Sequence, residues 1–196
     1  MAASRFQRAF ALAAIGVAFL SAGFAAAAGP APGPAPANPK APKPKLADYR
    51  IAEELVNAHI ATFDALDFDV FTHQKWDRLK ESHAPNIKVH WPDGHETKGL
   101  EQHVEDLKAM FVYAPDTRIL VHPVKFGSGE WTSVIGVMQG TFTNPMPVAG
   151  GKPIPPTGRA FLLVMCTVGH WKDGVMDEEY LFWDNQTFMK QLGLGQ

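Results

Sequence analysis

Histidines close to one predicted strand are the first residues of this sequence that could carry chemistry. His83, His90 and His95 follow one another with six and then four residues between them, and Glu96 comes directly after. Imidazole nitrogens and carboxylate oxygens bind transition metals, so two or three of these side chains could meet around an ion. Their spacing matches no standard zinc pattern. We therefore predict no metal site here, because a histidine in a small domain more commonly makes a polar contact or lies at the surface.

Three residues on predicted strands are candidates to line a cavity. Residues 87–91 alternate between apolar and polar types, which indicates a short strand. Because successive side chains of a strand point to opposite faces, either His90 or Trp91 faces the interior. His122 lies between apolar residues of a later predicted strand and could also face inwards. We take His90, Trp91 and His122 as candidate substrate-binding residues.

Arg159 and Cys166 each have two readings. Arg159 follows a Pro-Pro-Thr-Gly turn. It could bind an anionic group of a substrate or anchor its loop to a carboxylate, and the second reading is favoured. Cys166 lies in an apolar run, where a cysteine behaves as a small hydrophobic residue rather than as a nucleophile. Since it is the only cysteine, the chain can form no internal disulfide.

The first 28 residues have the pattern of an export signal. Arg5 and Arg8 precede an uncharged apolar run over residues 9–24, and small residues follow at 25–28. This run is shorter than the roughly 20 residues that span a bilayer, so a cleaved signal peptide is favoured over a retained membrane anchor. We predict a periplasmic or secreted protein that keeps no stable membrane span after cleavage.

Two further segments complete the predicted domain organisation. Residues 29–45 alternate proline with alanine, glycine and lysine, which is typical of an extended, semi-rigid linker. Residues 46–196 are long enough for one domain with its own core. All 20 Asp and Glu residues lie in this domain with only 13 of the 18 Lys and Arg residues, which argues against a nucleic-acid partner.

The hydrophobic pattern of this domain changes from a helical to a strand period along the chain. Helical spacing covers residues 46–66, 67–81 and a third segment that begins at Thr97 or Gly99, with the short strand 87–91 between them. Strand patterns and glycine turns follow, and a helical tail ends the domain; the predicted ranges are 118–126, 131–143, 159–171 and 175–184 for the strands and 185–192 for the tail.

This order predicts an α+β domain in which N-terminal helices pack on one face of an antiparallel sheet. Gly136 and Gly140 lie inside a predicted strand, where glycines mark bends. Such bends would curl the sheet around the helices and leave a conical hollow. We expect this central pocket to hold a small molecule.

Four segments, in this order, resemble the SnoaL-like polyketide cyclases (ester cyclases) of the nuclear transport factor 2-like superfamily. They are WDRLKESHAPNIKVHWPDG, GLEQHVEDLKAMF followed by PDTR, PPTGR, and DGVMDEEYLFWDNQTFMKQLGL. The resemblance covers nearly all of residues 46–196. It implies a cone-shaped α+β fold with an apolar pocket, and an acid–base mechanism without metal or organic cofactor.

The resemblance also implies a catalytic pair. Asp184 matches the family's general acid–base, and His170 matches the histidine that assists it. A carboxylate that removes a proton beside a carbonyl needs a raised pKa, and apolar neighbours such as Phe182 and Trp183 could raise it by burial. The alternative role for Asp184 is to cap the tail helix.

Side-chain alternation extends the predicted site along the last strand. Glu178, Tyr180, Phe182 and Asp184 would share one face of that strand. If this face points inwards, Tyr180 and Phe182 also line the pocket and contact the substrate.

Three functions follow from these observations. The first is cofactor-free acid–base catalysis on a small carbonyl compound. The second is a module that binds an apolar ligand without reaction, and the third is a protein-interaction domain, because such sheets often pair into homodimers. The export signal shifts the expected ligand towards one that reaches the periplasm or the medium, since polyketide cyclases act on products made inside the cell.

Overall fold

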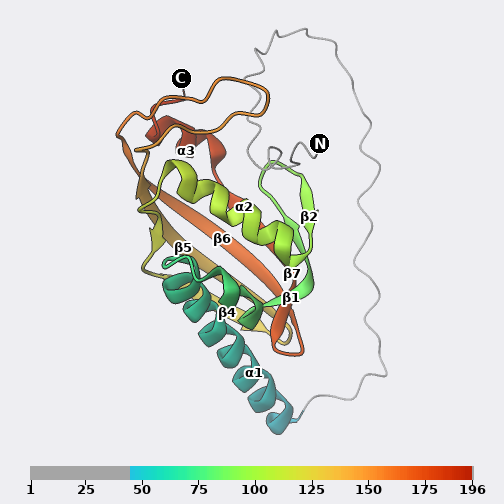
Figure 1. Ribbon diagram of the computed structural model, residues 1–196. Helices are drawn as coiled ribbons and strands as arrows, with labels where there is room; N and C mark the ends of the chain where they lie inside the picture. Colours follow the sequence, from blue (N-terminus) through green and yellow to red (C-terminus); the bar gives the residue numbers. More distant parts are fainter. Residues whose placement is uncertain (1–44, 196) are drawn as a thin grey trace, which may run out of the picture.

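The computed structural model describes residues 45–195 (Figure 1). The predicted signal peptide and all but the last residue of the predicted linker lie outside these residues. The described part forms one layer of helices against one curved sheet, which confirms the predicted α+β class and the nuclear transport factor 2-like architecture. None of its helices is long and apolar enough to cross a membrane.

Helix α1 (Leu46–Ala65) opens the domain and buries one stripe of its surface. The buried residues are Val56, His59 and Phe63, at the three- and four-residue intervals that place side chains on one face of a helix. The helix runs directly into a π-helical turn, η1 (Leu66–Phe71), and a 3₁₀ turn, η2 (Trp76–Glu81), follows. The predicted helix over 46–66 is confirmed, and the predicted helix over 67–81 consists of these two shorter turns.

Seven strands form one sheet in the order β2-β1-β7-β6-β5-β3, and β4 also pairs with β5. Two further helices are α2 (Leu100–Tyr113) and α3 (Asn185–Gln191). The strands are β1 (His83–His90), β2 (Glu96–Lys98), β3 (Arg118–Ile119), β4 (Val124–Ser128), β5 (Trp131–Thr141), β6 (Ala160–Lys172) and β7 (Val175–Trp183).

The sheet is mixed, so the prediction of an antiparallel sheet is wrong at one pairing. Strand β1 lies parallel to β7, with Val89 opposite Glu179. Parallel neighbours need a long connection, and here most of the domain separates the two strands along the chain. Sequence patterns of single strands do not report which distant strand becomes the neighbour. This pairing places the beginning of β1 beside the beginning of β7, with His83 opposite Met176.

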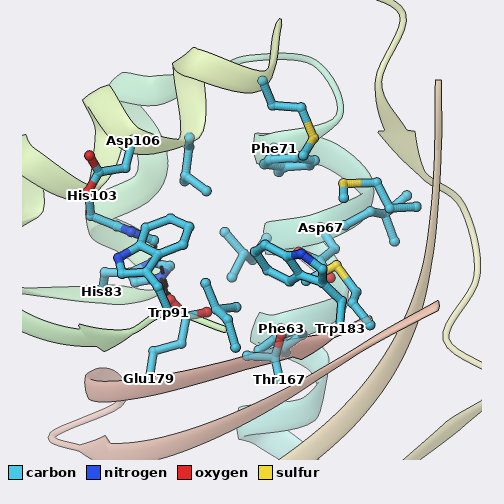
Figure 2. A pocket seen from close by; sticks show the side chains of 17 residues that line it. Phe63, Asp67, Phe71, His83, Trp91, His103, Asp106, Thr167, Glu179 and Trp183 are labelled. Carbon is cyan, nitrogen blue, oxygen red and sulfur yellow. Dashed lines mark ion pairs between the residues drawn. The ribbon is translucent and has the colours of Figure 1, made fainter. Parts of the chain in front are cut away.

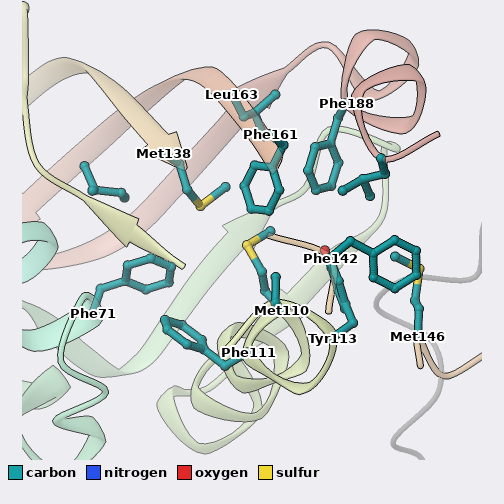
Figure 3. Packing of buried hydrophobic residues seen from close by; sticks show 13 residues of the cluster. Phe71, Met110, Phe111, Tyr113, Met138, Phe142, Met146, Phe161, Leu163 and Phe188 are labelled. Carbon is teal, nitrogen blue, oxygen red and sulfur yellow. The ribbon is translucent and has the colours of Figure 1, made fainter. Parts of the chain in front are cut away.

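The sheet curls, and α1 and α2 cover its concave face (Figure 1). At Gly140, inside β5, a β-carbon would lie 2.8 Å from the ring of Phe161, so any other residue there would force that ring to shift. Two buried apolar clusters fill the concave side. One, beside α3, includes Phe111, Phe161 and Phe188 (Figure 3), and the other packs around Trp171.

The two clusters meet around a small set of residues that are only partly buried. Leu107, Met165 and Trp183 pack against both clusters. All three also line an interior cavity of the domain. The cavity therefore lies at the junction of the two clusters, between the helices and the concave face of the sheet.

Candidate functional site

An apolar cavity with a few polar side chains lies inside the cone (Figure 2). It offers about 60 Å³ to the centres of water-sized molecules, several times the 10–15 Å³ that one water requires. Its walls are mostly aromatic and aliphatic. The polar groups among the lining residues are Asp67, His83, His103, Asp106, Thr167 and Glu179, and the indoles of Trp91 and Trp183 also line it.

Three of the polar side chains form a buried cluster. His83 begins β1, His103 lies on α2 and Glu179 lies on β7, and each is at least 96% buried. The Nε2 atoms of His83 and His103 lie 3.8 Å and 3.4 Å from Oε2 of Glu179. We call these three residues the His–His–Glu cluster.

The orientation of His83 is set by its neighbours along the chain. The Ser82 hydroxyl donates to the carbonyl of Leu79 at 3.1 Å, and its oxygen lies 2.9 Å from Nδ1 of His83. Nδ1 also faces the Leu79 carbonyl at 3.3 Å. Because both partners accept, Nδ1 carries the proton and Nε2 presents a lone pair to the cavity. Nε2 of His83 and Oε2 of Glu179 have no hydrogen-bond partner among the described residues.

Burial sets the charge states of the other two members of the cluster. It lowers the pKa of His103 to about 4, so this imidazole is neutral near pH 7. Burial alone would raise the pKa of Glu179, but the two imidazoles beside it, His83 and His103, outweigh burial and lower the pKa. Glu179 is therefore an ionised carboxylate inside an apolar cavity.

Asp67 is a second carboxyl group at the cavity, contributed by η1. Its Oδ2 accepts a hydrogen bond from Nε2 of His122 at 2.8 Å, and Nδ1 of His122 lies 2.8 Å from Oδ1 of Asp64. Burial raises the pKa of Asp67 despite the opposing effect of His122. Figure 2 shows Asp67 on a different wall from the His–His–Glu cluster.

His122 is held as an imidazolium between the two aspartates. Its side chain is 1% exposed, and its ring lies against Phe63 and Phe68. Burial opposes its charge, but the hydrogen bonds and charges of Asp67 and Asp64 outweigh burial and raise the pKa of His122. Lys125 also pairs with Asp64. A continuous polar path thus leads from the surface to the cavity.

The structure places Asp184 outside the cavity. It is exposed and serves as the N-cap of α3, where its Oδ1 accepts hydrogen bonds from the backbone amides of Gln186 and Thr187 at 2.9 and 3.1 Å. Hydrogen bonds from Thr187 and Gln186 lower the pKa of Asp184, which is opposite to the shift that proton abstraction near pH 7 requires. Of its two predicted roles, the geometry corresponds to the helix cap.

His170, Tyr180 and Phe182 lie on the outer face of the sheet, so the predicted inward face of the last strand is wrong. His170 pairs with Asp177 at 2.6 Å, and Phe182 is 53% exposed. In β7 the direction is set by a β-bulge near Asp177, since His170 opposes Glu178 whereas the next residue, Trp171, opposes Met176. One extra residue reverses the alternation that follows, and Glu179, Leu181 and Trp183 face inwards instead.

The other predicted substrate-binding residues are dispersed. Trp91 lies on the cavity wall. His90 faces outwards, stacks on Tyr180 with ring centroids 4.0 Å apart, and pairs with Glu178 at 2.7 Å. His122 is buried behind Asp67 rather than on the wall, and Arg159 is exposed on the loop before β6.

Most of the cavity's polarity comes from residues that were not predicted from the sequence. His103 and Asp106 share the inward face of α2 with Leu107 and Met110, a three- and four-residue spacing that the sequence does show. Glu179, Leu181 and Trp183 are two residues apart on β7, so their side chains share one face of the strand. A prediction that Trp183 faces inwards would therefore also have placed the Glu179 side chain inside. No comparable signal marks Asp67, because it lies in an irregular helical turn.

Comparisons with known proteins agree on one family. The model of the SnoaL-like polyketide cyclase family matches residues 63–192. A search of curated proteins found no match.

Solved structures share the fold. A candidate SnoaL-like polyketide cyclase from Jannaschia sp. CCS1 is 19% identical with a TM-score of 0.62, covering 72% of this chain and 96% of that one. IdmH from Streptomyces antibioticus, a candidate polyketide cyclase, is 24% identical with a TM-score of 0.59, covering 69% and 98%. At these identities the solved structures establish the fold, and the family match establishes membership. The chain therefore belongs to the SnoaL-like polyketide cyclase family.

Proposed function

We propose that this protein is an exported enzyme that moves a proton on a small carbonyl compound bound in the cavity, with Asp67 as the group that exchanges the proton. The observation that carries the proposal is that Asp67 and Glu179, two of the three carboxyl groups that line one apolar cavity, have pKa values shifted in opposite directions. The pKa of Asp67 is raised and that of Glu179 is lowered. Two carboxyl groups whose environments separate their pKa values are suited to different roles in acid–base chemistry.

The raised pKa suits Asp67 to proton transfer. A carboxyl group exchanges protons most efficiently when its pKa approaches the working pH, and burial moves Asp67 in that direction. His122 holds the carboxyl in one orientation through Oδ2, which leaves the other oxygen for the substrate. The apolar walls exclude water, so a bound carbonyl compound would exchange its proton with Asp67 rather than with solvent.

The His–His–Glu cluster would bind the polar end of the substrate. Nε2 of His83 and Oε2 of Glu179 are buried polar atoms of the cavity that need a partner, as are Nδ1 of His103 and Oδ2 of Asp106. Trp91 and Trp183 donate their indole N–H groups to Thr97 and Asn185 at 2.9 and 2.6 Å, so they present only ring surfaces to a ligand. Orientation of the ligand therefore depends on the cluster, on Asp67 and on Asp106.

The test is hydrogen–deuterium exchange at the carbon beside the carbonyl, followed by NMR with a panel of small ketones and esters in D₂O. Wild-type protein should accelerate exchange for at least one compound, and Asp67→Asn should lower the rate about 100-fold or more while the compound still binds. The matched control is Asp69→Asn, because Asp69 lies on the same turn but pairs with Lys75 and Arg78 away from the cavity. Equal rates in Asp67→Asn and wild type would reject the assignment.

The second candidate function is ligand binding without reaction, which the largely apolar lining favours. The same experiment separates the two. A compound that raises the thermal midpoint of unfolding of wild type and Asp67→Asn alike, with no exchange in either protein, identifies a binding module.

We propose that the protein is exported, because residues 1–28 have the pattern of a signal peptide. We also propose that it self-associates through the outer face of the sheet. Expression of the full chain followed by cell fractionation and N-terminal mass spectrometry tests export. Recovery outside the cytoplasm with a new N-terminus near residue 29 is expected, and an intact N-terminus in the cytoplasm would reject it.

A further inference from the structure

We propose that His83, His103 and Glu179 hold one divalent transition-metal ion of the zinc class, with a further coordination position open to the cavity. The ion would be bound by Nε2 of each histidine and by Oε2 of Glu179. The acid–base mechanism that the family resemblance implies has no metal, so this site would be an addition to it.

The separations within the cluster match a coordination shell. The three candidate ligand atoms all lie within 4.8 Å of one another, and two of their separations are 3.4 and 3.8 Å. Tetrahedral zinc with bonds of about 2.0–2.1 Å places neighbouring ligand atoms about 3.4 Å apart. The cluster therefore has nearly the spacing that surrounds an ion, and small side-chain adjustments would complete it.

Several other histidine–carboxylate pairs of the described residues are closer, whereas the more exposed contacts of His73 with Asp69 and of His170 with Glu130 are 3.4 and 3.6 Å long. The shorter distances include 2.6 Å for His170 with Asp177, 2.7 Å for His90 with Glu178, and 2.8 Å for His122 with Asp67. Those are hydrogen-bond lengths, in which a proton lies between the two atoms. In the His–His–Glu cluster the gap is wider by 0.6 Å or more, which leaves room for an ion.

The hydrogen bonds around His83 prepare a lone pair for a cation. Because Nδ1 of His83 carries its proton towards Ser82 and Leu79, Nε2 points a lone pair at the carboxylate of Glu179. Two electron-rich atoms face each other in a dry cavity without a partner, an arrangement that is costly unless a cation joins them. A backbone or side-chain acceptor behind a histidine is the usual second layer of a metal site.

The three ligands come from three regular elements. The parallel pairing of β1 with β7 brings His83 near Glu179, and α2 places His103 above them, with the rings of His83 and His103 5.0 Å apart between centroids. Three protein ligands with an open position are characteristic of catalytic rather than structural zinc. An ion here would polarise a bound carbonyl oxygen; only this role rests on the proposed function, whereas the binding of the ion does not.

The test uses the full-length protein, treated with a chelator and dialysed. Isothermal titration with Zn²⁺ should give one ion per chain, and Co²⁺ should give the visible absorption of a four-coordinate site. Glu179→Gln and His103→Gln should remove stoichiometric binding. Ser82→Ala, which keeps all three ligands, should weaken binding about 10- to 100-fold.

Two controls separate this site from surface binding. His90→Gln and His95→Gln change histidines that pair with acidic residues outside the cluster, and both variants should bind as wild type does. Circular dichroism tests whether each variant is folded. If the ligand variants do not fold, Ser82→Ala still tests the site, because it keeps all three ligands. Absence of stoichiometric binding to wild type, or wild-type affinity in Glu179→Gln, would overturn the proposal. Loss of metal binding in Glu179→Gln together with unchanged binding in Asp67→Asn distinguishes this site from the proton-transfer group.

Discussion

His122 donates to Asp67 from Nε2 at 2.8 Å while its other ring nitrogen faces Asp64 at the same distance, so one buried imidazolium joins the cavity to the surface. The three residues come from the end of α1, from η1 and from the segment between β3 and β4. Removal of the central ring would leave two carboxyl groups without their shared partner.

We expect His122→Leu to destabilise the protein by about 3 kcal/mol, because breaking a buried ion pair leaves an unpaired charge. Urea unfolding followed by circular dichroism measures the free energy of unfolding. The control is His73→Leu, an exposed histidine that faces Asp69 at 3.4 Å, for which we expect less than about 0.5 kcal/mol. Similar losses in both variants would show that burial of His122 does not matter.

The same histidine predicts a pH dependence of stability. Its pKa is raised in the folded state, so its contribution is complete below its unfolded pKa of about 6.5 and is lost as the pH rises through the folded pKa. His103, with its pKa lowered to about 4, acts in the opposite sense as the pH falls below about 6.5. The difference in unfolding free energy between wild type and His122→Leu isolates His122. It should shrink as the pH rises above about 6.5, and a constant difference would contradict the assignment.

Asp184 can be tested with two substitutions that separate a cap from a catalyst. Asparagine also caps helices, whereas alanine does not. The free energy of unfolding should therefore fall by about 1 kcal/mol in Asp184→Ala and by much less in Asp184→Asn. Both variants should retain the proton-exchange activity of wild type. Loss of exchange in a stable Asp184→Asn protein would restore the catalytic role that the family resemblance implies.

The outer face of the sheet predicts a homodimer. Leu162, Val164 and Phe182 are each more than half exposed, and strand pairing places Ile135, Cys166 and Phe182 in one row across this face. Burial of such a patch favours association. Phe182→Glu should convert a dimer to a monomer in size-exclusion chromatography with light scattering. Tyr49→Glu, on exposed α1, should not, and a monomeric wild type would refute the interface.

Local patterns predicted most of the elements. The helix over 46–66, the strand over 159–171 and the tail helix over 185–192 agree with α1, β6 and α3 to within one or two residues. The predicted strand over 118–126 is two strands, because Pro123 lacks an amide hydrogen and the chain between them pairs only partly. Four ordered segments also predicted the family.

The site was less predictable, for physical reasons that involve particular residues. Asp67 acquires its environment from His122, which is 55 residues away along the chain. His83 meets Glu179 through a parallel pairing that no single strand pattern reports. The inward direction of Glu179 depends on the bulge near Asp177, which appears only in the pairing of β7 with β6. Each of these features depends on a contact between distant segments, which local periodicity does not encode.

That bulge has a consequence for how the family can diversify. Glu178 and Glu179 are adjacent, and one lies among Lys88 and His90 on the outside while the other lies in the cavity. Deletion of the single codon for Asp177 would remove the bulge without changing the interior, because Glu178 would then follow Met176 directly and Glu179, Leu181 and Trp183 would still face inwards. Insertion of one residue after Glu178 would instead reverse the later alternation and bring Tyr180 and Phe182 inside. The position of a length change relative to the bulge therefore decides whether this scaffold keeps its interior or acquires a chemically different one.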